Sequence, residues 1–157
     1  MKHRWIATDC VSIAMPASEK SKEVSDYREI REFYDRIYYR DANHPSPVSD
    51  HLWRLAKKLG PWKGVKLLDI ACGTGGWLMA AAALGAIPAG IDISQKAAEV
   101  CRRALPGADI HCGSAEKLPC NENEFDFISC LGALEHFVDA PTALREMVRV
   151  GKPNAVV

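Results

Sequence analysis

The hydrophobic pattern of the chain changes at residue 65. From there on, short apolar runs alternate with stretches in which apolar residues recur at helical spacing. The runs predict strands at 65–70, 87–93, 108–112 and 125–131, and the helical spacing predicts helices at 77–84 and 95–104, the second capped by Ser94. Strands alternating with helices of this length are joined by right-handed crossovers. The sequence therefore predicts an α/β fold, a doubly wound parallel sheet with helices on both faces.

The C-terminal stretch predicts one more helix and the beginning of one more strand. The helix carries Leu144, Met147 and Val148 on its predicted inner face and ends at Gly151. Residues 154–157 have the character of a fifth strand, which the chain begins but does not complete. We therefore expect a sheet that is truncated at its fifth strand.

The residues before the sheet predict a flexible arm followed by helices. Residues 1–22 lack a sustained period and predict the arm, 23–62 predict two N-terminal helices, and 63–157 the α/β core. The first helix, at 23–39, has tyrosines and isoleucines at helical spacing with charges between them. Packing into the core is the favoured interpretation of its aromatic side. A lid across the mouth of a pocket is the alternative.

A glycine-rich turn follows the first predicted strand. Residues 67–78 read LLDIACGTGGWL, with glycine at 73, 75 and 76 between the strand and the next helix. Glycines permit positive φ and remove the Cβ atoms that would keep a ligand from the main-chain amides at the helix N-terminus. The turn alone is compatible with a nucleotide-like ligand or with an ordinary strand-to-helix connection.

The ends of the next two strands favour the ligand. In an open α/β sheet, ligands bind outside the carboxyl ends of the strands. Asp92 ends the second strand nineteen residues beyond Gly73, where an acid can accept hydrogen bonds from both ribose hydroxyls. Ser114, Ala115 and Glu116 follow the third strand in a loop suited to enclosing a flat base. Three consecutive strand ends thus predict one nucleoside site.

Asp69, directly before the glycine turn, restricts the kind of nucleoside. Its carboxylate repels phosphate groups and attracts a cation. A dinucleotide fingerprint also requires glycine at position 78, where this chain has Leu78. S-adenosylmethionine has a sulfonium, an ammonium group and an adenosine, and it has no phosphate. The alternative is that Asp69 caps local backbone amides.

Five segments in this order and spacing carry a family resemblance: LLDIACGTGGW, GIDIS, GSAEKLP, FDFISCLGALEHF and REMVRVGKP. The region 65–157 resembles the class I S-adenosylmethionine-dependent methyltransferases, most closely the type 11 group, which have a Rossmann-like fold. The resemblance implies that Asp69, Ala71, Gly73 and Gly75 hold the methionine part of the cofactor and that Asp92 binds the ribose. It implies that the adenine pocket is formed by Ile93, Ser114, Ala115, Glu116, Leu131 and Gly132.

Two features depart from the family pattern. Ser114 stands where the family usually has an acid that receives the adenine amino group, so that contact falls to the Ala115 amide and Glu116. Family members also have seven strands, whereas this chain is C-terminally short and stops at the fifth. An open sheet edge invites pairing with another copy, so we expect a homo-oligomer, such as a dimer, that shares this edge.

The resemblance implies an enzyme that transfers a methyl group to a small-molecule acceptor by in-line displacement and leaves S-adenosylhomocysteine. Alignment of donor and acceptor can supply most of the acceleration. A hydroxyl or ammonium acceptor also needs a base, for which Glu135 and His136 are the nearest candidates, although a structural role is favoured for this pair. The alternative functions are a non-catalytic binder of S-adenosylmethionine or S-adenosylhomocysteine and a truncated, inactive methyltransferase. A nicotinamide dehydrogenase is disfavoured.

Composition adds few constraints. Twenty basic residues balance twenty acidic ones, so nothing indicates a nucleic-acid partner. Six scattered cysteines without a C-x-x-C pair predict buried, reduced thiols and no metal site. No stretch has the length of a membrane span. We expect one cytoplasmic domain.

Overall fold

The computed structural model describes residues 27–157. Within them lies one parallel sheet with strand order β3-β2-β1-β4-β5, and all neighbouring strands pair in parallel. The strands are β1 (Lys66–Ile70), β2 (Ile87–Asp92), β3 (Asp109–Cys112), β4 (Phe125–Cys130) and β5 (Gly151–Val156). Strand order changes direction beside β1, because β1 lies between β2 and β4. The predicted α/β fold is confirmed.

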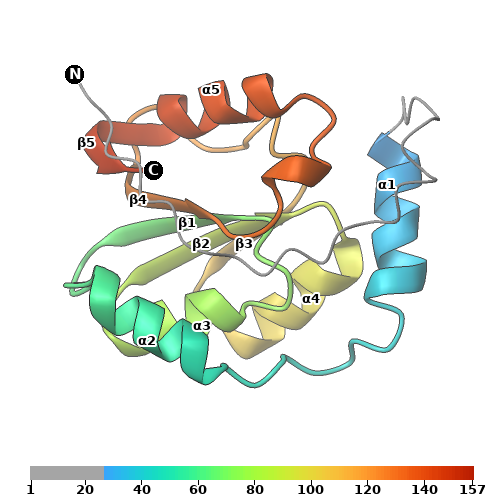
Figure 1. Cartoon of the computed structure of the whole chain (residues 1–157), viewed down its shortest axis with the longest axis horizontal. Helices are drawn as coiled ribbons and strands as arrows, with labels where there is room; N and C mark the ends of the chain where they lie inside the picture. Colours follow the sequence, from blue (N-terminus) through green and yellow to red (C-terminus); the bar gives the residue numbers. More distant parts are fainter. Residues whose placement is uncertain (1–26) are drawn as a thin grey trace.

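Helices cover both faces of this sheet (Figure 1). One face carries α2 (Asp50–Leu59), α3 (Gly76–Ala83) and α4 (Gln95–Ala104), and the other carries α5 (Ala140–Val150). The α4 helix begins as predicted, with the Ser94 hydroxyl accepting from the amide of Ala97 at 3.0 Å. A short 3-10 helix, η3 (Leu134–His136), lies between β4 and α5.

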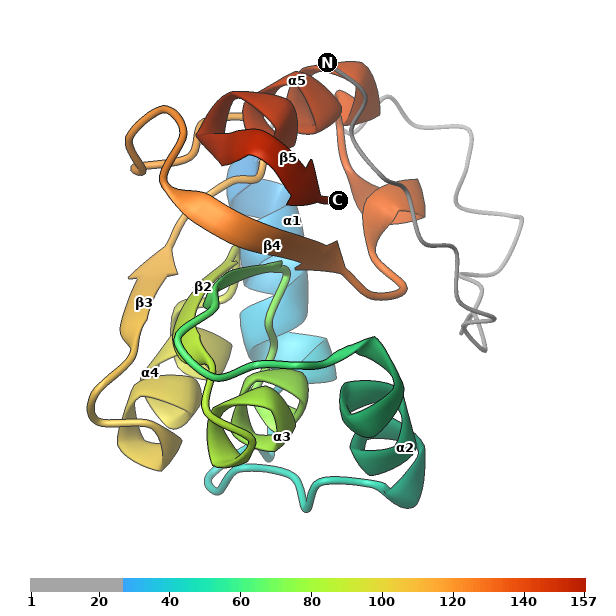
Figure 2. The same ribbon diagram turned by 90° about the vertical axis from the view of Figure 1, so that its left-hand side faces the viewer.

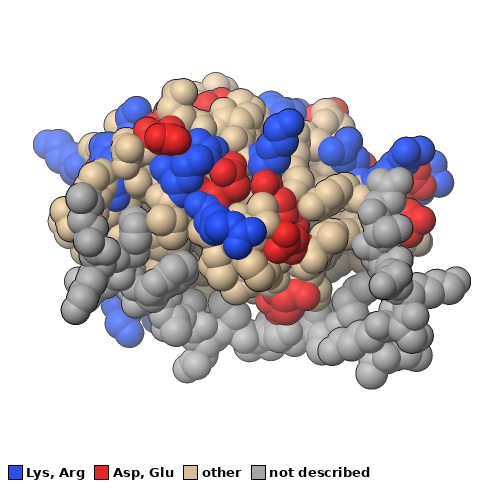
Figure 3. Space-filling model, turned by 90° about the horizontal axis from the view of Figure 1, so that it is seen from above, with Lys and Arg blue, Asp and Glu red and all other residues tan. Residues whose placement is uncertain are grey.

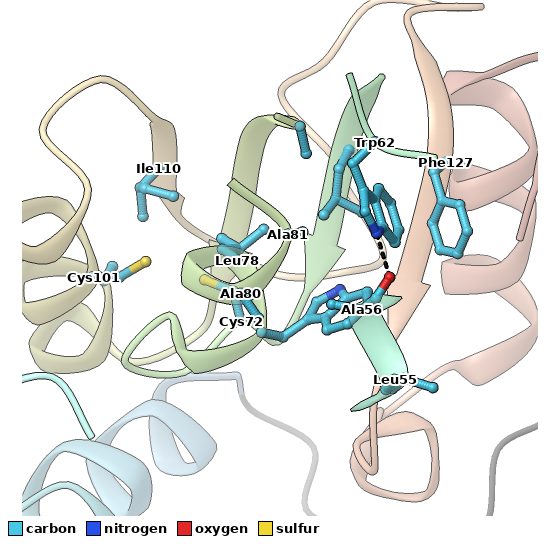
Figure 4. Packing of buried hydrophobic residues seen from close by; sticks show 14 residues of the cluster. Leu55, Ala56, Trp62, Cys72, Leu78, Ala80, Ala81, Cys101, Ile110 and Phe127 are labelled. Carbon is cyan, nitrogen blue, oxygen red and sulfur yellow. Dashed lines mark hydrogen bonds between the residues drawn. The ribbon is translucent and has the colours of Figure 1, made fainter. Parts of the chain in front are cut away.

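Alternating residues of β1 build the two halves of the core. Leu67 packs with Trp77 and Leu78 of α3, whereas Leu68 and Ile70 pack on the α5 side. In the first half, the Trp62 indole lies beside Phe127 and donates to the carbonyl of Ala56 at 2.6 Å (Figure 4). Both faces of the strand are therefore fixed, so its carboxyl end holds the glycine turn in one position.

The N-terminal helix differs from the prediction. The predicted arm at 1–22 and the first residues of the predicted helix lie outside the described residues. What is described is α1 (Tyr27–Phe33), which continues as a π-helix, η2 (Tyr34–Tyr38). Neither contains a buried residue, and α1 stands at the carboxyl ends of the strands (Figures 1 and 2). The core interpretation of this helix is therefore wrong.

Two C-terminal predictions also need correction. Strand β5 begins at Gly151, three residues earlier than expected, because α5 runs directly into it without a loop. Within α5 the buried residues are Ala143, Met147 and Val150, whereas Val148 is 37% exposed. The stripe that faces the sheet is thus rotated away from Val148.

None of the helices described between residues 27 and 157 is long and apolar enough to cross a membrane. On the face that carries α5, Lys and Arg side chains are interspersed with Asp and Glu (Figure 3). That face therefore presents no large field of a single sign.

Candidate functional site

A cavity of about 500 Å³ opens at the carboxyl ends of the strands. Its walls come from the loops after β1, β2, β3 and β4, from α1 and η2, and from the first turns of α2. Pockets for small ligands have volumes of roughly 300–1,000 Å³ and occur at the topological switch points of such sheets. Both its size and its place suit a nucleoside cofactor.

The turn from β1 to α3 adopts the backbone conformation that its glycines permit. Gly73 and Gly75 have φ values of +55° and +90°, and Ala71 also has a positive φ, of +58°. A Cβ at Gly75 would lie 2.6 Å from the Cys101 sulfur, so the turn is pressed against α4. Glycine is thus required at position 75 both by the conformation and by the space.

Asp92 is the buried acid of the site. Its side chain is 4% exposed, and its two carboxylate oxygens accept from the amides of Gly73 and Ser94, each at 2.8 Å. Burial raises the pKa of Asp92, and the two amide hydrogen bonds counteract that shift in part. Each carboxylate oxygen can accept a further hydrogen bond. Because Asp92 also lines the cavity, it fits the diol of a ribose.

Asp69 lies beneath the cavity rather than on its wall. Its carboxylate is 3% exposed and accepts from the Ser129 hydroxyl at 2.7 Å, and that hydroxyl accepts from the Trp77 indole at 2.9 Å. Burial raises the pKa of Asp69 to about 7, although the Ser129 hydrogen bond lowers it. Asp69 thus links β1, β4 and α3 under the glycine turn.

The loop after β3 is locked by its own side chains. The Ser114 hydroxyl donates to the Glu116 carboxylate and accepts from the Glu116 amide at 3.1 Å. That carboxylate also accepts from the amide of Asp139 at 3.2 Å. The three residues predicted to enclose the base, Ser114, Ala115 and Glu116, all line the cavity.

Another part of the cavity lining is aromatic and apolar and carries two imidazoles. His136 and Phe137 line it from η3 and the residue after it, and His51 lines it from the first turn of α2. Glu135, the other candidate base, is exposed and does not line the cavity. No signal in the sequence singled out His51, because it follows the N-cap of an ordinary amphipathic helix.

The α1–η2 segment covers the cavity from above. Tyr27, Tyr34, Tyr38 and Tyr39 all line it. A Cβ at Gly73 would lie 2.9 Å from the Tyr39 hydroxyl, so Tyr39 rests on the glycine turn. Burial raises the pKa of Tyr39 well above its usual value, which keeps the phenol protonated. The position of this segment agrees with the alternative interpretation of the predicted helix at 23–39, a lid across the mouth of a pocket.

Eight of the eleven residues predicted to bind the cofactor line this cavity: Ala71, Asp92, Ile93, Ser114, Ala115, Glu116, Leu131 and Gly132. The other three, Asp69, Gly73 and Gly75, lie behind that wall. Of these three, Gly73 contacts the lining directly, because its amide donates to Asp92, whereas Gly75 packs on Cys101 and Asp69 bonds to Ser129, neither of which lines the cavity.

The described cysteines are free thiols, with Cys72 and Cys101 buried. A hydrogen bond to Cys101 and burial raise the pKa of the Cys72 thiol, so it stays protonated. Cys10 lies outside the described residues. Across residues 27–157, no group of three or more His, Cys, Asp and Glu side chains is placed to hold a metal ion.

Together, the sheet order, the glycine turn and buried Asp92 define a nucleoside-binding domain of the doubly wound α/β class. Residues 68–157 match the family model described as a methyltransferase domain. The chain belongs to the class I S-adenosylmethionine-dependent methyltransferases, and its cofactor is S-adenosylmethionine.

Relatives and solved structures agree with this assignment. The chain is 34% identical over 140 residues to a demethylmenaquinone methyltransferase of Staphylococcus aureus, a match that covers 83% of this chain and 56% of that protein. The YcgJ protein of Bacillus subtilis superposes with a TM-score of 0.62 and 28% identity, covering 68% of this chain and 48% of that one. The [4+2]-cyclase SpnF superposes with a TM-score of 0.68 and 25% identity, covering 82% of this chain and 58% of that one. The chain thus spans about half the length of the curated relative.

Proposed function

We propose that this protein transfers a methyl group from S-adenosylmethionine to a small, apolar, ring-containing acceptor. One observation carries the proposal: a single cavity is lined both by the buried Asp92 carboxylate and the loop after β3 and by aromatic and aliphatic side chains with two imidazoles. Such a cavity accommodates a nucleoside and an apolar ring next to each other.

The cavity residues that follow β2 and β3 fit the cofactor. Asp92 is placed to accept from the ribose hydroxyls, Ile93 to flank the adenine, and Ser114, Ala115 and Glu116 to line its edge. Ala71, at the start of the glycine turn, lines the cavity and is placed to contact the methionine part, with Asp69 behind it. When bound, the cofactor supplies an electrophilic methyl group on a sulfonium. This chain contributes alignment, which is worth roughly 7–11 kcal/mol in favourable cases.

The apolar residues that line the cavity support an apolar acceptor. Leu52, Leu55, Phe137 and Val138 line the cavity, and two of its apolar lining residues remain exposed: Tyr38 is 55% and Val138 46% exposed. An apolar rim of this kind is typical of a site that receives an apolar molecule. Since the relative from Staphylococcus aureus is named for demethylmenaquinone, a substituted naphthohydroquinone is the first acceptor to test.

Within this proposal, His136 acts as the base that removes a proton from a ring hydroxyl of the acceptor. It is half-buried in the cavity wall, and its neighbour Phe137 helps to exclude water. General-base catalysis by a positioned histidine contributes roughly 10²–10⁴-fold. His51, on the rim, contacts the acceptor.

The test measures transfer of an isotope-labelled methyl group from the cofactor to reduced demethylmenaquinone, to a simple phenol and to a polar amine. The proposal predicts product with the naphthohydroquinone and none with the amine. His136→Ala should lower kcat about 10²–10⁴-fold with little change in the KM of the cofactor. His111→Ala is the matched control, because His111 pairs with Asp109 on β3 away from the cavity. Equal activity of both variants would exclude His136 as the base.

The same assay separates the alternative, a non-catalytic binder. That function predicts tight binding of S-adenosylhomocysteine in calorimetry, with no labelled product from any acceptor class. The aromatic lining and its two imidazoles support turnover over binding alone, since a protein that only binds the cofactor does not need side chains that would receive an acceptor.

We also propose cytoplasmic localisation and self-association. The free thiols support a reducing compartment. Within the described residues, β3 is an edge strand with β2 on one side only, which supports pairing between copies. Sedimentation at decreasing concentration tests the second point, and a folded monomer that binds the cofactor would contradict it.

A further inference from the structure

Three hydrogen bonds from the α1–η2 segment converge on the turn that follows Asp92. The guanidinium of Arg31 donates to the carbonyl of Ile93 at 3.1 Å. The carboxylate of Asp35 accepts from the Ser94 hydroxyl at 2.5 Å and from the Lys96 amide at 3.2 Å. The Lys96 ammonium in turn donates to the carbonyl of Arg40.

Ser94 connects these contacts to the cofactor site. It is fully buried, its amide donates to Asp92 at 2.8 Å, and its hydroxyl both donates to Asp35 and accepts from the Ala97 amide. Asp92 is held on its other oxygen by Gly73, over which the Tyr39 hydroxyl lies. The segment therefore contacts both loops that orient the Asp92 carboxylate.

We propose that Asp35 is a positioning residue for cofactor binding: it latches the α1–η2 segment to the N-terminus of α4 and, through Ser94, holds Asp92 in its binding geometry. The inference rests on the proposed function and extends it to a residue that does not line the cavity. Its charge also complements the partial positive charge of a helix N-terminus.

The latch explains why this segment remains in place without a buried side chain. Apolar burial is the usual force that docks a helix, and in α1 and η2 it is only partial, because Ile30, Phe33 and Tyr34 are half-buried and no side chain is fully buried. Hydrogen bonds to a charged group are worth more than neutral ones, and those of Asp35 form in a half-buried place. Loss of Asp35 should therefore loosen the segment and the turn after Asp92 together.

The test compares Asp35→Ala, Asp35→Asn and Asp41→Ala in the full chain. Asp35→Ala removes both hydrogen bonds, whereas Asp35→Asn keeps an oxygen that accepts them. Asp41 is the matched control, an exposed acid of the same region that pairs with the adjacent Arg40. Two readouts are used: amide hydrogen exchange of the unliganded protein, and the dissociation constant of S-adenosylhomocysteine from calorimetry.

We expect Asp35→Ala to accelerate exchange both in 27–39 and in 93–97 and to weaken S-adenosylhomocysteine binding roughly tenfold to hundredfold. Asp35→Asn should stay within about threefold of the parent, and Asp41→Ala should match it. Arg31→Met, which breaks the separate bond to Ile93, should give a smaller change with the same pattern, and its exposed site keeps the test valid if Asp35→Ala does not fold.

Unchanged exchange in 93–97, or unchanged affinity while 27–39 loosens, would overturn the inference. If the parent protein itself does not bind S-adenosylhomocysteine, the proposed function fails, whereas the exchange measurement still decides whether Asp35 couples the two segments.

Discussion

Substitution of Gly75 by alanine tests the geometry of the glycine turn. Gly75 has φ +90°, and a Cβ there would lie 2.6 Å from the Cys101 sulfur. The left-handed conformation costs an L-residue about 1–2 kcal/mol, and overpacking costs about 1–3 kcal/mol. We therefore expect Gly75→Ala to lower the free energy of unfolding by about 2–5 kcal/mol, a large part of the stability of a domain of this size.

Substitutions at two other glycines separate the cost of the backbone conformation from the cost of the steric clash. Gly64 has φ +77° with no atom within 4 Å of its Cβ position, so Gly64→Ala carries the conformational cost alone, about 1–2 kcal/mol. Gly107 has equally open surroundings without a positive φ, so Gly107→Ala should be neutral or stabilising by up to about 1 kcal/mol. The three variants should rank in that order.

Urea unfolding followed by tryptophan fluorescence measures all three, with unchanged m-values as the sign of a common transition. Cys101→Ala in the Gly75→Ala background removes the sulfur and should restore about 1–3 kcal/mol. If the double variant is no more stable than Gly75→Ala, or if Gly64→Ala is equally destabilised, the clash is not the cause and the reasoning is refuted.

Three further predictions concern buried and partly buried polar groups. Because burial raises the pKa of Asp69 to about 7 in the folded state, the folded chain keeps a proton that the unfolded chain releases, so stability falls as pH rises from about 4 to about 7. Asp69→Asn should remove up to about 4 kcal/mol of this pH-dependent loss of unfolding free energy. Urea titrations in which the unfolding free energies of both proteins fall equally with pH would contradict the prediction. Ser129→Ala leaves the Trp77 indole N–H and the Asp69 carboxyl without their partner and should lower the free energy of unfolding by about 1–3 kcal/mol in the same assay. A loss below about 0.5 kcal/mol would contradict a stabilising role for these two hydrogen bonds. Arg149→Met removes donors to two backbone carbonyls of the loop after β3 and should speed amide exchange there, whereas Lys152→Met, which breaks an exposed ion pair, should not.

The parts of the fold that the sequence predicted are those that local chemistry determines. Helix α4 has the predicted bounds because Ser94 satisfies its first amides and charged residues complete its outer face. The sheet followed from the alternation of strands and helices. By contrast, Gly151 and Pro153 both weaken a strand signal, and β5 accommodates Pro153 as an edge strand with an irregular register.

The proposed cofactor residues that line the cavity could be placed from the sequence for the same reason. Asp92 and the Ser114 loop come directly after strands, so their position follows from the sheet. Of the residues proposed to contact the acceptor, the sequence indicated His136 but not His51. His51, Tyr39 and Phe137 meet in the cavity through tertiary packing between distant segments, and no local spacing encodes that meeting.

Asp69 shows how a correct motif can leave a role open. Asp69 directly precedes the glycine turn, and the sequence predicts that its carboxylate is a direct partner of a cation. That role stays a prediction. The hydrogen bond to Ser129, from the neighbouring strand, depends on the pairing register of β1 and β4, which sequence spacing does not determine. A carboxyl with a pKa of about 7 ionises more readily when a cation binds above it. Cofactor binding should therefore release a proton from Asp69, which joins its structural position to the electrostatic role that the sequence indicated.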